Sequence, residues 1–141
     1  MAFNNIYRVS GSAMTAQTVR LNTIASNMAN ADSPSATENG VYKARRPVFA
    51  SVYQNDELMG NRALTGARVQ VMDVVETGNA VQRYEPNHPM ADDRGYVYYP
   101  DVNVVEEMAD MMSASRSFET SVDVLNSVKS MQQSLLRLGE V

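Results

Sequence analysis

Apolar side chains recur at helical spacing through residues 101–138, a segment that contains no Gly and no Pro. Those at every seventh position are Val104, Met111, Phe118 and Leu125. Three further seam positions stand four residues after the first three of these, namely Met108, Ser115 and Val122. Beyond Leu125 the seam continues through Val128, Met131, Leu135 and Leu138. This spacing predicts one helix with a narrow apolar seam, roughly 50 Å long. A chain of 141 residues cannot wrap a globule around such a rod, so the seam needs a partner.

Both ends of this helix carry sequence signals. Asn103 can cap the start, with Glu106 three residues later in a capping-box-like pattern, and Gly139 stands where the helix should end. Serine is a mediocre helix former, and the helix contains seven serines, at positions 113, 115, 117, 121, 127, 130 and 134. We therefore expect the helix to be weakly formed until its seam is buried.

A second helix is predicted for residues 4–30, where Tyr7, Met14, Leu21 and Met28 again stand seven apart and Ile24 adds an apolar position. Its only charged residues are Arg8 and Arg20. A solvated helix usually carries many Lys and Glu side chains. The uncharged surface favours a helix that is contacted from several sides, the alternative being a single packed face.

In the middle of the chain the spacing of apolar residues changes from the helical period to a period of two, which is typical of strands. After a turn-rich break at residues 32–40, residues 41–53 and 67–76 read as two strands joined by a long hairpin loop. Pro47 limits the first to an edge or bulged strand. Residues 81–84 and 95–99 are candidate further strands. The fold class is therefore mainly α with a small β insert.

Composition narrows the function classes. The net charge is −4 and the pI is about 4.9, which argues against broad nucleic-acid binding, and the absence of cysteine excludes disulfides and thiolate chemistry. No apolar run reaches the ~18–20 residues of a membrane span, and the start of the chain does not read as a secretory signal. We expect the protein either to stay in the cytoplasm or to leave it without a cleaved signal.

Candidate chemistry is sparse, and we predict no catalytic, cofactor or metal site. His88 with Asp92 and Asp93 offers no evident fourth ligand for a metal, so a surface loop is the simpler interpretation. Four carboxylates could in principle serve glycoside hydrolysis, namely Asp92, Asp93, Glu106 and Glu107. Nothing in the sequence places two of them across a cleft at the required separation. The basic run Lys43, Arg45 and Arg46 is expected to be solvated, with an anionic partner as the alternative. Core packing is expected for Met108, Met111 and Met112 rather than a peptide groove.

Three stretches resemble a known family. LNTIASNMANADS (residues 21–33) resembles the N-terminal signature of flagellar axial proteins, the rod, hook and hook-associated family. YEPNHPMADDRGYV (84–97) and DVNVVEEMADMMSASRSFETSVDVLNSVKSM (101–131) resemble proximal-rod members of that family. Ser121 stands where the family commonly has Asn, and residues 48–76 match little.

The resemblance implies a structural protein. Residues 1–33 and 101–141 would form a discontinuous helical domain, an elongated antiparallel coiled coil, with residues 34–100 as the middle segment. The subunit would polymerise into a hollow, torque-transmitting proximal rod across the periplasm. Its partners would be copies of itself, related rod proteins, ring or adaptor proteins at the base, and the flagellar type III export apparatus.

We expect the assembly interface on the helical seams, within or between subunits. Its predicted residues are Tyr7, Met14, Leu21, Ile24 and Met28, facing Met111, Phe118, Leu125 and Leu135. The second reading is a soluble helical adaptor or export chaperone, and a wall-cleaving enzyme is a distant third.

Overall fold

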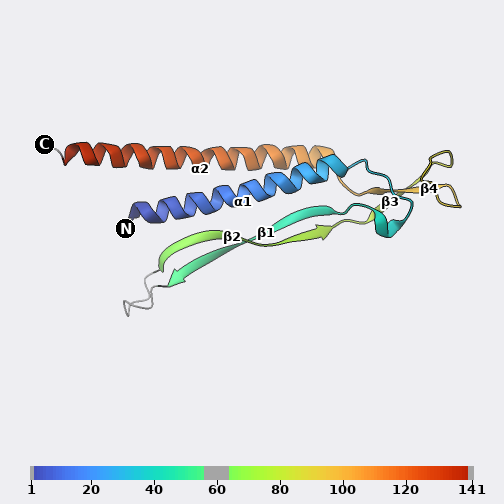
Figure 1. Ribbon diagram of the computed structural model, residues 1–141, viewed down its shortest axis with the longest axis horizontal. Helices are drawn as coiled ribbons and strands as arrows, with labels where there is room; N and C mark the ends of the chain where they lie inside the picture. The colour runs from blue at the N-terminus through green and yellow to red at the C-terminus, as the bar shows by residue number, and fades with distance from the viewer. Residues whose placement is uncertain (1, 56–63, 140–141) are drawn as a thin grey trace.

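Two long helices run antiparallel along most of the length of the molecule (Figure 1). The computed structural model describes residues 2–55 and 64–139. Helix α1 spans Ala2–Asn30 and helix α2 spans Val104–Leu138. Both chain ends therefore lie at the same end of the molecule, and the C-terminal end of α2 extends past the start of α1 (Figure 1). The prediction of two terminal helices is confirmed.

The start of α2 is capped as its sequence indicates. The Asn103 side chain accepts hydrogen bonds from the backbone N–H groups of Val105 and Glu106, at 3.1 and 3.4 Å. The Glu106 carboxylate accepts a hydrogen bond from Arg46. Gly139 forms the C-cap, with its N–H directed to the carbonyls of Leu135 and Leu136.

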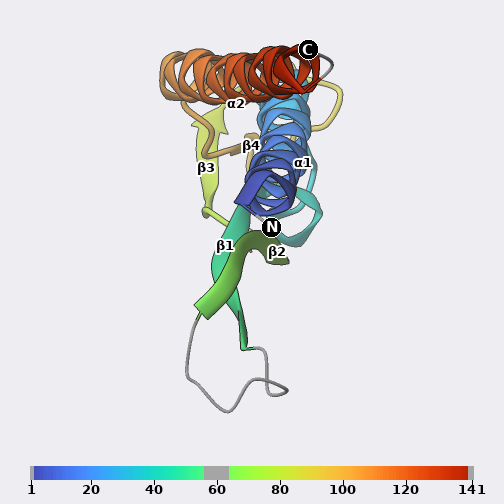
Figure 2. The ribbon, with the colours of Figure 1, turned by 90° about the vertical axis from the view of Figure 1, so that its left-hand side faces the viewer.

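Helix α1 is the middle layer of three. A view along the molecule shows α2 on one side of α1 and the strands β1 (Ala44–Asn55) and β2 (Leu64–Thr77) on the other (Figure 2). Helix α1 contacts all three elements. The expectation that an uncharged helix is contacted from several sides is confirmed.

Strands β1 and β2 form an antiparallel hairpin whose register shifts between Val48 and Phe49, directly after Pro47. The extra residue at this shift, Met72, lies on β2, so the prediction from Pro47 is confirmed as an edge strand and not as a bulge in β1. Strand β2 is longer than expected, whereas β1 begins and ends a few residues later than the predicted 41–53. Residues 56–63 of the predicted loop lie outside the described residues. The hairpin runs beside α1 near its base and diverges from it towards its tip (Figures 1 and 2).

The two further strand candidates also pair. Strands β3 (Ala80–Tyr84) and β4 (Tyr96–Pro100) form a second antiparallel sheet, and Ser35 forms an isolated bridge to Tyr98. This sheet and its connection lie at the end of the molecule opposite to the chain termini (Figure 1). The turn-rich break contains a short 3-10 helix, Glu38–Gly40.

The buried core is thin and built mainly from small side chains. Its buried apolar residues are Ala16, Ile24, Ala31, Val41, Ala44, Val97, Ala114 and Val128. Among the side chains that are less than 2% exposed, the largest are Val97 and Asn27. A polar side chain is therefore as central to this fold as any apolar one.

Candidate assembly interface

The side of α2 towards α1 is a stripe with alternating steps of three and four residues. Its buried and half-buried members are Val104, Glu107, Met111, Ala114, Phe118, Ser121, Leu125, Val128 and Gln132. Near its two ends the stripe is tied to α1: Glu107 Oε1 accepts a hydrogen bond from Asn27, and Gln132 Oε1 accepts one from the Tyr7 hydroxyl at 3.0 Å. This spacing is typical of helices that pair along their length.

The sequence interpretation placed the intermediate seam positions one residue too late. The structure buries Glu107 and Ala114, whereas Met108 is 50% exposed and Met112 is 61% exposed. The prediction that both methionines are core residues is therefore wrong for the single chain. Ala114 is fully buried because its small side chain lets the helices approach, and Glu107 can be buried because polar partners surround it.

The predicted interface residues fall into three groups by burial. Most are half-buried in the single chain, and Ile24 is buried at 4% exposure. Leu135 is 53% exposed, near the end of α2. Which of these residues contact a neighbouring subunit stays a prediction. The half-buried members are Tyr7, Met14, Leu21, Met28, Met111, Phe118 and Leu125.

Asn27 joins α1 to the start of β1 through a side chain that is 1% exposed. Its Oδ1 accepts hydrogen bonds from the Arg45 backbone N–H at 2.8 Å and from the Tyr42 hydroxyl at 2.9 Å. Its Nδ2 donates to the Arg45 carbonyl at 3.0 Å and to Glu107 Oε1 at 3.2 Å. All four hydrogen-bonding positions of the amide are filled, which is what burial of a polar group requires.

Charged side chains continue this contact between β1 and both helices. Arg46 lies 3.3 Å from Glu106, 4.0 Å from buried Glu107 and 3.9 Å from Asp110. Arg20 of α1 pairs with Asp110 of α2 at 3.0 Å. We call the set Arg20, Asn27, Arg45, Arg46, Glu107 and Asp110 the polar junction. It fixes how the hairpin and the two helices sit together.

The polar junction corrects the interpretation of the basic run. Arg45 pairs with Glu76 across the hairpin at 3.4 Å and lies 5.7 Å from the Tyr42 ring centroid. Arg46 pairs with α2, so both arginines have partners within the chain rather than only water. Sequence reasoning did not identify Asn27 as a site residue. The one sequence feature that could have indicated it was its position inside the N-terminal signature, residues 21–33.

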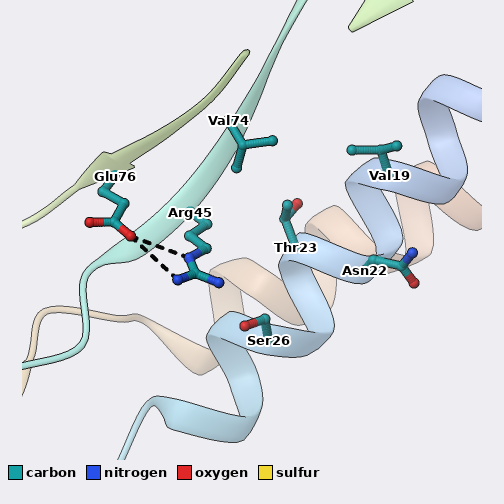
Figure 3. Close-up of a pocket in the computed structure, with 7 residues that line it drawn as sticks. All are labelled: Val19, Asn22, Thr23, Ser26, Arg45, Val74 and Glu76. Carbon is teal, nitrogen blue, oxygen red and sulfur yellow. Dashed lines mark hydrogen bonds and ion pairs between the residues drawn. The ribbon is translucent and has the colours of Figure 1, made fainter.

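An open groove of about 510 Å³ separates α1 from the hairpin. Figure 3 shows Arg45 and Glu76 on the hairpin side, facing Thr23 and Ser26 of α1. Val19 and Val74 supply its apolar lining. Apart from the one ion pair, the groove has small neutral walls, without the convergent polar groups of a small-molecule site.

The connection between β3 and β4, residues 85–95, is organised by its own side chains. Asp92 Oδ1 accepts hydrogen bonds from the backbone N–H groups of Arg94 and Tyr96, and His88 Nδ1 accepts one from Met90. Gly95 has φ +81° and lies against the Tyr84 ring, so a side chain there would be strained. His88 and Asp92 thus shape a turn, and the described residues contain no group of three potential ligands for a metal ion.

Tyr99 of β4 is held beside this connection. Its hydroxyl donates to Glu85 at 3.1 Å, and the Arg83 guanidinium lies 4.6 Å from its ring centroid. Desolvation and the bond to the Glu85 carboxylate raise the pKa of Tyr99 above its ordinary value. The raised pKa keeps the phenol protonated, and able to donate to Glu85, further into the alkaline range.

Much apolar surface of α2 remains exposed. Val124, Met131, Leu135 and Leu138 share one stripe of the helix, with exposures of 41%, 53%, 53% and 74%. Every residue at positions 133–139 is exposed. Within the described parts of the chain, no helix is long and apolar enough to cross a membrane. An exposed apolar stripe of this kind is typical of a site of protein contact.

Comparison with known proteins identifies the class. The family described as flagella basal body rod protein matches residues 8–37, and the family described as flagellar basal body rod FlgEFG protein C-terminal matches residues 93–138. Both matched segments contain most of a terminal helix. The paired helices therefore belong to a structural component of the flagellar rod.

Relatives that match along the full length identify which rod protein family the chain belongs to. A flagellar basal-body rod protein FlgC of Escherichia coli is 48% identical over 141 residues, covering 99% of this chain and 100% of the relative. One of Salmonella typhimurium is 46% identical with the same coverage. One of Borreliella burgdorferi is 34% identical, covering 92% of this chain and 93% of the relative. The chain belongs to the FlgC family of flagellar basal-body rod proteins.

Proposed function

We propose that this rod component is a subunit of the proximal rod and assembles helically with copies of itself and with related rod proteins. The resulting shaft is hollow, crosses the periplasm and transmits torque. The observation that carries this proposal is the exposed apolar stripe of α2, beside a helix pair that is only half-buried in the single chain. Full burial of an exposed apolar side chain contributes about 1.5–3 kcal/mol, so burial of the remaining exposed part of each such side chain contributes roughly half of that.

In this proposal α1 and α2 act as one coiled-coil unit, formed by residues 1–33 and 101–141, and residues 34–100 form the outward middle segment. Neighbouring subunits contact the predicted interface residues where these are half-buried or exposed, above all Leu125 and Leu135. The role is mechanical, and no catalytic step is assigned to any residue. Export through the flagellar type III apparatus and contact with ring or adaptor proteins at the base complete the proposed partners.

Purified basal bodies provide the test. Quantitative mass spectrometry should recover the chain in stoichiometric amount with other rod proteins from intact basal bodies, and cells lacking the chain should build no rod beyond its position. A chain found only in the cytosol and absent from basal bodies would favour the adaptor or chaperone reading instead.

A further inference from the structure

The first half of α2 carries apolar side chains on its surface. Three of them are at least half exposed: Val105, Met108 and Met112. Each directly follows a residue of the stripe that faces α1, so all three lie on the same flank of that stripe. We name them the base patch. Glu106 and Asp110 directly precede stripe residues and so lie on the other flank, where they pair with arginines of the polar junction. The base patch is therefore on the flank that the polar junction leaves free.

The second half of α2 exposes its apolar side chains mainly on the other flank. Val124 and Met131 directly precede stripe residues, and Leu138 continues their seven-residue spacing. We name Val124, Met131 and Leu138 the end patch. Among residues 124–138, only Leu136 exposes a large apolar side chain on the flank of the base patch. The two patches thus occupy different halves and opposite flanks of one helix.

This placement distinguishes between two kinds of contact between copies of the chain. A two-fold pair turns the same flank of both α2 helices towards each other, so it leaves one patch of each copy exposed. A head-to-tail contact brings the base patch of one copy against the end patch of the next. It buries both patches and can be repeated from copy to copy, as helical assembly requires.

The spacing within the patches sets a register for such a contact. When two α2 helices run in the same direction and Met112 lies beside Met131, Val105 lies beside Val124, because the two pairs have the same offset in sequence. This offset corresponds to a stagger of about 28 Å along the helices. Helical symmetry keeps all copies pointing the same way along the axis, which agrees with the parallel direction.

A carboxylate extends the base patch and supports the same register. Glu119 stands seven residues after Met112, on the same line of the helix, and within the described residues its side chain forms no ion pair. In the parallel register Glu119 lies beside Leu138 and next to Arg137 of the other copy. In the reversed direction, with Met112 beside Val124, it would meet the uncharged Ser117.

The two halves of α2 also differ in overall charge. Residues 104–123 contain five acidic side chains and one Arg, whereas residues 124–138 contain one Lys, one Arg and no acid. Opposite charge favours contact between unlike halves, and like charge disfavours contact of a half with its own copy. Charge and patch geometry therefore select the same occupant.

We propose that the base patch is the docking site for the end patch of a second copy of this chain, with the two α2 helices parallel and Met112 beside Met131. Methionine suits such a contact because its unbranched side chain adapts to its neighbour. Met112 also borders a groove of about 340 Å³ on the surface of α2, where the small side chains of Ala109 and Ser113 leave room for an incoming side chain. This inference rests on the proposed function, because assembly of the rod is what supplies the second copy.

Photo-crosslinking in basal bodies tests the contact. With benzoylphenylalanine in place of Met112, irradiation should give a dimer of the chain in which position 112 is linked to residues 124–138. Such a link cannot form within one helix, because those residues lie about 18 Å or more along the axis from position 112. The matched control has the same group at Ser113, which is exposed and directly precedes Ala114, on the other flank. It should give at least tenfold less of this product.

The other outcomes are distinguishable. A link to residues 104–123 of a second copy would show a like-to-like contact, a link only to a different rod protein would show another occupant, and no link at all would show an uncovered patch. Each would overturn the inference and leave the proposed function standing. Absence of the unmodified chain from basal bodies would instead refute the proposed function.

A charge exchange tests the register. Glu119 is exposed, so we expect Glu119→Arg to melt within a few degrees of the unmodified chain when isolated, yet to be recovered in basal bodies at least threefold less. Adding Arg137→Glu restores opposite charges across the contact and should return recovery to near that of the unmodified chain. Equal losses in the single and the double variant would overturn the proposed register.

Discussion

Asn27 shows how one side chain can determine the arrangement of three elements. It lies on α1, holds β1 through the backbone of Arg45 and contacts α2 through Glu107. From sequence, an Asn near the end of a helix reads as a surface or capping residue. Its four partners come from distant parts of the chain, so only the tertiary structure reveals its role.

Replacement of Asn27 by Ala should therefore be costly. The variant leaves the backbone of Arg45 and the buried Glu107 carboxylate without their partner, and we expect a loss of about 2–4 kcal/mol in the free energy of unfolding. Asn22→Ala on the same helix is the control, because Asn22 is exposed, and it should change stability by less than about 0.5 kcal/mol. Urea denaturation measures both, and equal midpoints would show that the polar junction does not stabilise the fold.

At the scale of elements, sequence periodicity predicted both helices and all four strands, because each has a regular spacing of apolar residues or a clear turn beside it. Periodicity did not identify which flank of α2 faces α1. The prediction chose Met108 on hydrophobicity, whereas the structure buries Ala114 and Glu107. Ala114 is buried because its small side chain lets the helices approach closely, and Glu107 is buried because its carboxylate has polar partners. Both conditions depend on the opposing helix, which the periodicity of α2 does not describe.

Helix α2 should be unevenly stable in the free chain. Its start is capped by Asn103 and tied to the polar junction, whereas residues 133–139 are exposed throughout. Ser117, Ser121 and Ser134 also hydrogen-bond carbonyls four residues earlier, a pattern that slightly weakens helices. We expect amides of residues 107–118 to exchange roughly tenfold or more slower than those of residues 129–138.

Hydrogen exchange followed by mass spectrometry on a verified monomer measures this difference. The same peptides should become uniformly protected in assembled rods. Strong protection along the whole of residues 104–138 in the monomer would show that α2 needs no neighbour to be stable.

At the scale of the whole molecule, three thin layers leave much of the apolar surface of α2 exposed, which suits a subunit that completes its packing against neighbours.

A single negative charge in the seam should therefore prevent assembly. Leu125→Asp removes the apolar contact of a half-buried seam residue, and we expect cells carrying it to build no rod and not to swim. Asn126→Asp adds the same charge at an exposed position and should preserve motility in a soft-agar assay. Normal swimming of Leu125→Asp would refute the predicted seam.

An electron cryo-microscopy map of the intact basal body tests the central claim most directly. The account predicts density for α1 and α2 as an antiparallel pair in the wall of the proximal rod, with Met131 and Leu135 buried against an adjacent subunit. A map in which the rod wall contains no such pair, or in which those two side chains face solvent, would contradict it.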